Sequence, residues 1–315
     1  MAGHGRRWAI RGAAGMAAAA AVLALLCNFW PRVELGQGSA PPPAGIESLP
    51  NPASRASGPA LLAMQASIEE IERQRPAVPT LYQLRGTPRI FVLDFPDMEA
   101  QGSAMNRVAA LVEKAGLPRD RVLPDDALAA AIAAAGDTPA TFYFAHNYRL
   151  RDLERFFALA DRDRILLNDA EGRLREAVGL IRRLVPDGNA ALLTVPAAGA
   201  AMAPDARGTM LAHEFSHGVY FTDPAYAAGV LSAWREGFTE AERDALRRWL
   251  ASEGYDPGME ELMANETQAY LLHTSDQRFF RPELVGLAAA DLDRLRQVLR
   301  SHIARAGGGK AAATP

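Results

Sequence analysis

The chain has 315 residues, of which 49% are hydrophobic and 23% are charged, and its formal net charge is −3. This composition is that of an ordinary globular protein, with enough residues for one large or two modest domains. The small net charge and the mixing of arginines with acidic residues give no reason to expect a nucleic-acid partner.

Residues 1–30 have the layout of an export signal. Three arginines (Arg6, Arg7 and Arg11) precede an uncharged run from Gly12 to Trp30. The run is close to the length of about 20 residues that a membrane-spanning helix needs. Because no A-x-A cleavage site follows it, we expect an uncleaved membrane anchor, with a removed signal peptide as the alternative. The preceding arginines predict that the rest of the chain lies outside the cytoplasm, in the periplasm.

Two further segments are expected to have no packed structure. Residues 31–58 read as a linker rich in proline, alanine and glycine, and residues 307–315 read as a disordered tail. Cys27, in the predicted anchor, is the only cysteine of the chain. The exported part therefore has no disulfide and no thiol that could bind a metal.

Residues 59–188 are predicted to form a small α/β part. Strands are expected at residues 89–95 and 141–144, and helices at residues 61–71, 105–115, 125–135, 150–160 and 170–184. This alternation indicates a sheet covered by helices. Three polar residues follow or end the strands, and we interpret them as structural: Asp94, His146 and Tyr148.

Residues 189–306 carry the motif that predicts a function. A short strand at residues 190–195 precedes H-E-F-S-H, residues 213–217, in an apolar and helix-forming context. Residues four apart share one face of a helix, so His213 and His217 can bind one metal ion, and Zn²⁺ is commonly bound in this way. Glu214 is placed to accept a proton from a zinc-bound water.

A catalytic zinc site needs a third protein ligand, and two glutamates compete for this position. Glu266 lies inside a predicted helix at residues 260–272, where its side chain is well fixed. Glu236 lies at a helix end beside a glycine. We favour Glu266, because catalytic ligands need rigid support, and retain Glu236 as the alternative.

The pair H-E-F-S-H and N-E-T-Q-A, residues 265–269, resembles the gluzincin branch of the zincin metallopeptidases. In this branch a glutamate on a second helix completes a His-His-Glu zinc site, so the resemblance implies the ligands His213, His217 and Glu266. Glu236 is instead similar to the glutamate of the aminopeptidase subgroup, although its neighbours depart from that pattern. Together with the sequence pattern of the preceding segments, the predicted fold is α+β, with a small α/β half, a mainly helical zincin-like half and an N-terminal membrane anchor.

The predicted function is therefore that of a membrane-tethered zinc peptidase with Glu214 as the general base. Tyr270 and His273 are candidates for stabilising the oxyanion of the transition state, as is Tyr220. A zinc amidase acting on cell-wall material is one alternative. A binding protein of the cell envelope, in which the metal has a structural role only, is the other.

Overall fold

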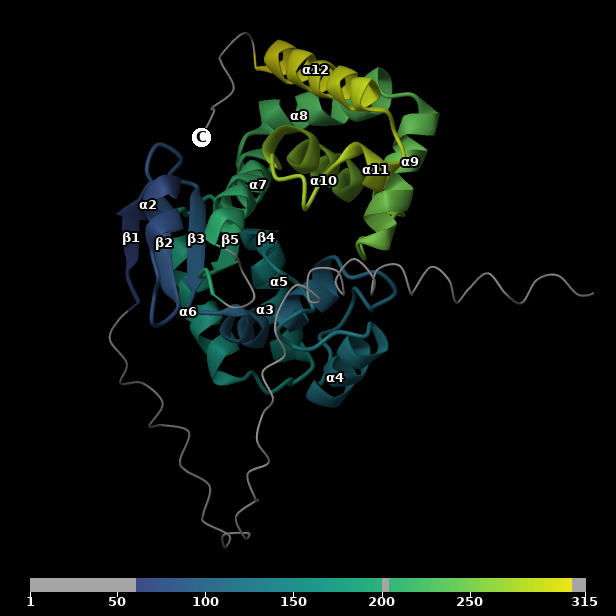
Figure 1. Cartoon of the computed structure of the whole chain (residues 1–315). Helices are drawn as coiled ribbons and strands as arrows, with labels where there is room; N and C mark the ends of the chain where they lie inside the picture. The colour runs from purple at the N-terminus through teal and green to yellow at the C-terminus, as the bar shows by residue number, and fades with distance from the viewer. Residues whose placement is uncertain (1–60, 200–203, 308–315) are drawn as a thin grey trace, which may run out of the picture. The chain divides into compact units, whose positions relative to one another are not determined.

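The computed structural model describes residues 61–199 and 204–307 (Figure 1). The predicted anchor, the predicted linker and the tail beyond Gly307 lie outside the described residues. Residue contacts divide the chain after Leu61, and the fold below is that of the unit that begins at Leu62. Among the described helices, none combines the length and the apolar character that a membrane crossing requires.

A five-stranded mixed sheet forms one layer of this unit. Its strands are β1 (Ala63–Ala66), β2 (Thr80–Leu84), β3 (Ile90–Phe95), β4 (His146–Arg149) and β5 (Ala191–Pro196). The order across the sheet is β1-β2-β3-β5-β4 (Figure 1). β3 and β5 are parallel, whereas β4 is antiparallel to β5. β4 is therefore an edge strand, and β5 inserts between strands that come much earlier in the chain.

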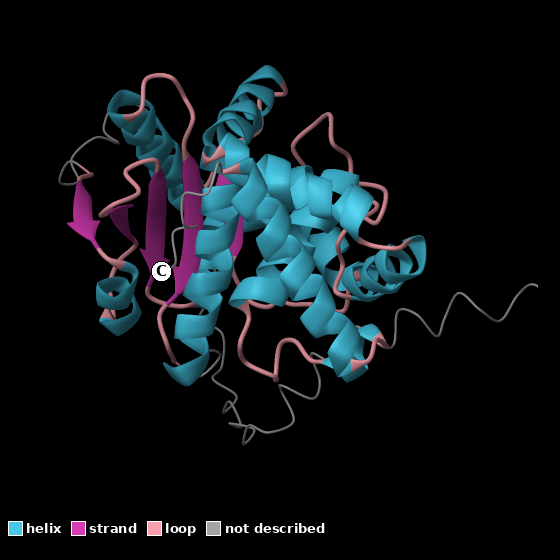
Figure 2. Ribbon diagram, turned by 90° about the horizontal axis from the view of Figure 1, so that it is seen from above, coloured by secondary structure: helices cyan, strands magenta, loops and turns pink. Residues whose placement is uncertain are grey.

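Helices cover both faces of the sheet (Figure 2). Every residue of β3 and β5 is buried, as expected for central strands with near-continuous apolar sequences. Helices α2 (Ile68–Arg73) and α7 (Pro204–Thr222) pack on one face in a shared apolar cluster. The opposite side is occupied by the remaining helices of this half: α3 (Met98–Val112), α4 (Asp125–Ala134), α5 (Leu150–Arg162) and α6 (Asp169–Leu184).

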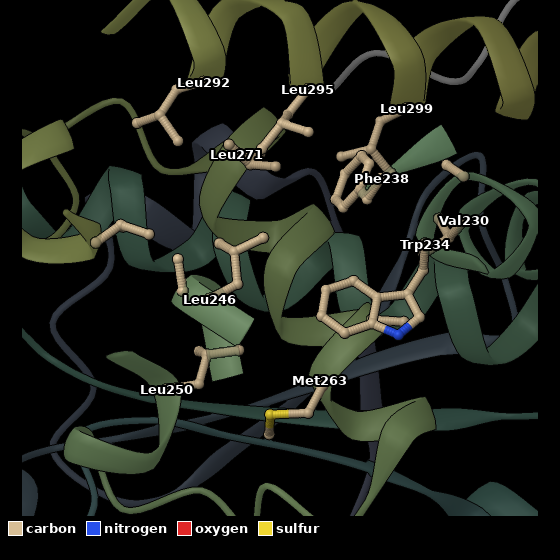
Figure 3. Packing of buried hydrophobic residues seen from close by; sticks show 14 of the residues in the cluster. Val230, Trp234, Phe238, Leu246, Leu250, Met263, Leu271, Leu292, Leu295 and Leu299 are labelled. Atoms are coloured by element: carbon tan, nitrogen blue, oxygen red, sulfur yellow. The ribbon is translucent and has the colours of Figure 1, made fainter. Parts of the chain in front are cut away.

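The C-terminal half is entirely helical. It comprises α8 (Pro224–Ser232), the π-helical segment η2 (Ala233–Gly237), α9 (Glu240–Ser252), α10 (Glu260–His273), α11 (Pro282–Val285) and α12 (Ala289–Ala306). Leu292, Leu295 and Leu299 follow the three- and four-residue spacing of one helix face and project from α12 onto α10 and η2 (Figure 3). This core holds α10 in place, and α10 packs in turn on α7.

Two of the expected elements differ from the structure. Residues 63–66 form β1 rather than a helix, because they pair with β2, and the helix begins only after Ser67, whose hydroxyl caps it. Residues 141–144 form no strand: Thr141 and Phe142 close a turn that begins at Thr138, and the strand lies instead at His146–Arg149, where it pairs with β5. β2 was not predicted. The mixed fold and the other strands and helices expected in the described residues are confirmed, although several ends differ; the largest difference is at α3, which begins at Met98 rather than at residue 105.

Candidate metal centre

Helix α7 has an apolar face on the sheet and a polar face directed away from it. Leu211 and Phe215 pack in the apolar cluster that includes β5. Each residue turns an α-helix by about 100°, so positions two residues further on lie on the opposite side. His213 and His217 therefore face α10, and the burial of the apolar face fixes their direction.

Helix α10 supplies the third group, Glu266. Its Oε2 atom lies 3.6 Å from Nε2 of His213 and 3.6 Å from Nε2 of His217, and the two Nε2 atoms are 3.1 Å apart. Donor atoms bound to one tetrahedral zinc at about 2.0–2.1 Å are about 3.3–3.4 Å apart. The predicted ligands are thus brought together, and this buried group could bind a metal ion.

A hydrogen bond from outside the group fixes the tautomer of His213. The Thr274 hydroxyl donates to the carbonyl of Ala269 and accepts from Nδ1 of His213, at 2.8 Å. This assignment places the His213 proton on Nδ1 and leaves a lone pair on Nε2. Glu266 Oε2 is buried and has no hydrogen-bond partner in the described part of the chain. Nε2 of His213 and Oε2 of Glu266 are thus two acceptors 3.6 Å apart, which repel one another unless a cation or a proton lies between them, so the residues fit a metal ion.

Burial also keeps both histidines in the form that binds metals. Desolvation lowers the pKa of His213 to about 3. It lowers the pKa of His217 to about 4, although the negative charge of Glu266 acts in the opposite direction. Both imidazoles are therefore neutral at pH 7, which is the form of histidine that binds metals.

Glu214 is the fourth buried polar group of the site. Nδ2 of Asn147, on the edge strand β4, donates a hydrogen bond to Glu214 Oε2 at 2.9 Å. Burial raises the pKa of Glu214 well above its usual value, although the Asn147 hydrogen bond acts to lower it. The Glu214 side chain is thus fixed between α7 and β4, next in sequence to His213, which is the position that a general base requires.

The structure places Tyr270 against the metal group. The centroid of its ring lies 4.6 Å from the centroid of the His213 ring, which it meets nearly edge-on. It also lies 4.6 Å from the centroid of the Trp249 ring. His273 is hydrogen-bonded instead to Tyr226, with 3.3 Å between Nε2 and the hydroxyl. Tyr220 has a buried hydroxyl with no partner in the described part of the chain. Of the three oxyanion candidates, Tyr270 is the one in contact with a ligand.

Glu236 does not belong to this group. It lies in the π-helical segment η2 and is exposed, and its carboxylate accepts a hydrogen bond from Ser232. The metal-ligand cluster in the described residues contains Glu266 alone as its carboxylate. The choice of Glu266 over Glu236 agrees with this arrangement.

The polar residues beside the strands have structural partners, as expected. Asp94 forms a buried ion pair with Arg207, with 2.8 Å between Oδ2 and the guanidinium. Nδ1 of His146 lies 2.9 Å from the hydroxyl of Thr194. Tyr148 donates a hydrogen bond to Glu113 on the side of β4 opposite Asn147.

Sequence reasoning missed three residues that support the site. Thr274 supports His213, and Asn147 holds Glu214. The Tyr255 side chain acts on Glu266, whose pKa it helps to lower against the effect of burial. Asn147 carries the only available sequence signal, because it alternates with the buried residues His146 and Tyr148 in a strand.

The chain was compared with family models, with curated proteins and with solved structures, and none of them matches it. Its likeness to zincins therefore consists of two short motifs that the fold brings together.

Proposed function

We propose that this protein is a zinc-dependent hydrolase that cleaves peptide bonds or related amides. The observation that carries the proposal is the convergence of His213, His217 and Glu266 on one buried point, next to the carboxylate of Glu214. A metal with a purely structural role has no need of a fixed, proton-accepting carboxylate beside it. Two neutral imidazoles and one carboxylate form the ligand set of many catalytic zinc sites.

Zinc bound by these residues would lower the pKa of a coordinated water towards about 7 and polarise the carbonyl of the substrate. Glu214 then accepts the proton of the attacking water and returns it to the leaving amine. Asn147 holds the Glu214 carboxylate in position during both transfers. Tyr270 packs edge-on against His213 and fixes the plane of this ring, and it is our preferred candidate for donating to the oxyanion.

We propose further that the hydrolase acts outside the cytoplasm while tethered to the membrane. The support for this is the sequence alone, namely the arginines before Gly12 and the uncharged run that follows them. An extracytoplasmic location would give the site access to exported peptides and to cell-wall amides.

The test uses the full-length chain loaded with zinc and a peptide library whose cleavage is followed by mass spectrometry. We expect Glu214→Gln to retain one zinc per chain and to lose hydrolysis by about 10²- to 10⁴-fold, the usual contribution of a general base. Glu236→Gln is the matched control and should retain full activity. Equal activity of Glu214→Gln and the parent would refute the role of Glu214. A zinc-loaded parent that cleaves nothing would indicate the structural metal of a binding protein.

A further inference from the structure

A pocket of about 310 Å³ lies at the end of the edge strand β4, where β4 passes into helix α5. Three arginines line it together with a single acidic residue and one aromatic ring: Arg149, Arg151, Arg182, Asp187 and Phe221. No part of the proposed catalytic machinery lies in this lining. The excess of guanidinium groups indicates a ligand with a negative charge.

The pocket is close to the proposed metal centre. Phe221 follows His217 by one turn of α7, and the two rings are stacked with 6.4 Å between their centroids. The guanidinium of Arg149 lies 4.4 Å from the centre of the Phe221 ring. Arg149 is also two residues beyond Asn147 on β4, so both side chains lie on the same face of the strand, about 6.8 Å apart along it.

One of the three arginines in the pocket has no close ion-pair partner in the described part of the chain. Arg149 pairs with Glu261, and Arg182 pairs with Glu154. In the described part of the chain Arg151 makes no hydrogen bond, and its nearest carboxylate oxygen, on Asp152, lies 3.9 Å away. Its side chain is 69% exposed. Arg151 therefore has its planar fork of N–H donors available for a ligand.

The backbone at this point adds to the attraction for an anion. Arg149 is the N-cap residue of the 13-residue helix α5, and its side chain makes no capping hydrogen bond. The first turn of α5 thus directs the positive end of the helix dipole towards the residues that line the pocket. β4 is the last strand in the order of the sheet, so its outer edge faces no other described strand.

We propose that this pocket binds a carboxylate of the substrate, about two residues from the bond that is cut. A substrate that lies along the outer edge of β4, with its reacting carbonyl beside Glu214 and Asn147, places a group two residues away next to Arg149 and Arg151. The protein would then prefer acidic peptides, either through a glutamate or aspartate side chain or through a terminal carboxylate. This inference rests on the proposed hydrolase function for the position of the substrate.

The test measures binding first, so that it does not depend on turnover. The full-length Glu214→Gln variant, loaded with zinc, is titrated with peptides that carry Glu or Gln at each position within three residues of the centre. Free and amidated C-termini distinguish a terminal carboxylate from a side chain. We expect at least one Glu peptide, or one free carboxyl terminus, to bind about tenfold more tightly than its neutral partner. Such a ratio corresponds to one charge-assisted contact.

Substitution of Arg151 assigns this preference to the pocket. In the Glu214→Gln background, Arg151→Gln should reduce the tenfold ratio to about one, and Arg151→Glu should favour a Lys peptide instead. Arg121→Gln is the control, because Arg121 is similarly exposed and its one ion pair within the described residues is with its neighbour Asp120. Equal binding of acidic and neutral peptides, absence of binding, or a preference that survives Arg151→Gln would each overturn the inference.

Turnover by the parent separates the two proposals. Hydrolysis of neutral and acidic peptides at equal kcat/KM would support the hydrolase and reject the carboxylate pocket. Preferential binding that depends on Arg151, without any cleavage by the zinc-loaded parent, would support the pocket and reject the hydrolase.

Discussion

The hydroxyl of Thr274 lies 2.8 Å from Nδ1 of His213, on the side of the imidazole away from Glu266. Because this hydroxyl also donates to the carbonyl of Ala269, it can only accept from the ring. Thr274 immediately follows α10, the helix that carries Glu266. One short segment thus supplies a carboxylate to the metal group and fixes the tautomer of a histidine on another helix.

Replacement of Thr274 by valine should weaken metal binding. Valine preserves the shape of the side chain but removes the acceptor for Nδ1–H, so the ring loses the partner that orients it. Loss of such an outer-shell partner typically costs about 10- to 100-fold in metal affinity. Competition with a chromogenic chelator measures this affinity, and Thr274→Ser should keep it within about twofold of the parent. Unchanged affinity in Thr274→Val would mean that packing alone orients His213.

The two glutamates considered as third ligand should differ sharply in the same assay. Glu266→Gln removes a negative charge from the proposed metal site. It should lower zinc affinity by more than about 100-fold, which is the largest loss expected for an outer-shell partner. Glu236→Gln should have no effect, because Glu236 is exposed on η2 and bonds only to Ser232. The opposite ranking of the two variants would show that the metal binds elsewhere.

The grouping of the candidate ligands could be predicted from sequence because their placement is largely local. His213 and His217 share a face of one helix, and Glu266 occupies a helix interior whose small neighbour Ala269 is fully buried. Helix periodicity settles such directions without knowledge of the fold. Glu236 was distinguished from Glu266 by the same local reasoning.

The supporting residues could not be predicted, because their roles depend on strand register. A strand placed at residues 141–144 gives no information about Asn147, whereas the observed strand directs Asn147 to α7 and Tyr148 to the other face. The pairing of β4 with β5 fixes this register, and the two strands are more than 40 residues apart in the chain. For the same reason β2 was missed and β1 was assigned to a helix, since the formation of short strands depends on the strands that pair with them.

The helical half should depend strongly on α12, whose sequence was not assigned to any element. Leu295 is completely buried against the core that supports α10 (Figure 3). Leu295→Ala should lower the free energy of unfolding by about 2–5 kcal/mol, through lost burial and the cavity it leaves. Urea denaturation measures this loss. Leu166→Ala, at a side chain that is 81% exposed, should stay within about 0.5 kcal/mol, and a similar loss in both variants would contradict this account of the core.

Glu113 is a buried carboxyl group outside the metal cluster. It is 5% exposed and accepts a hydrogen bond from Tyr148. Burial raises the pKa of Glu113 from 4.5 to about 8, although the bond from Tyr148 acts to lower it. The group is therefore protonated in the folded metal-free protein at pH 7 and ionised in the unfolded chain.

This shift predicts a pH dependence of stability with a definite sign. Below about pH 4.5 the carboxyl is protonated in both states and has no effect, whereas between pH 4.5 and 8 only the unfolded state loses the proton, so the folded state loses stability as the pH rises. At about 1.4 kcal/mol per pKa unit, the full loss is on the order of 5 kcal/mol. Glu113→Gln keeps the acceptor for Tyr148 but cannot ionise. In the presence of a chelator, its stability relative to the parent should rise from pH 4.5 to 8 and then remain level. A difference that does not change with pH would show that Glu113 is ionised in the folded protein.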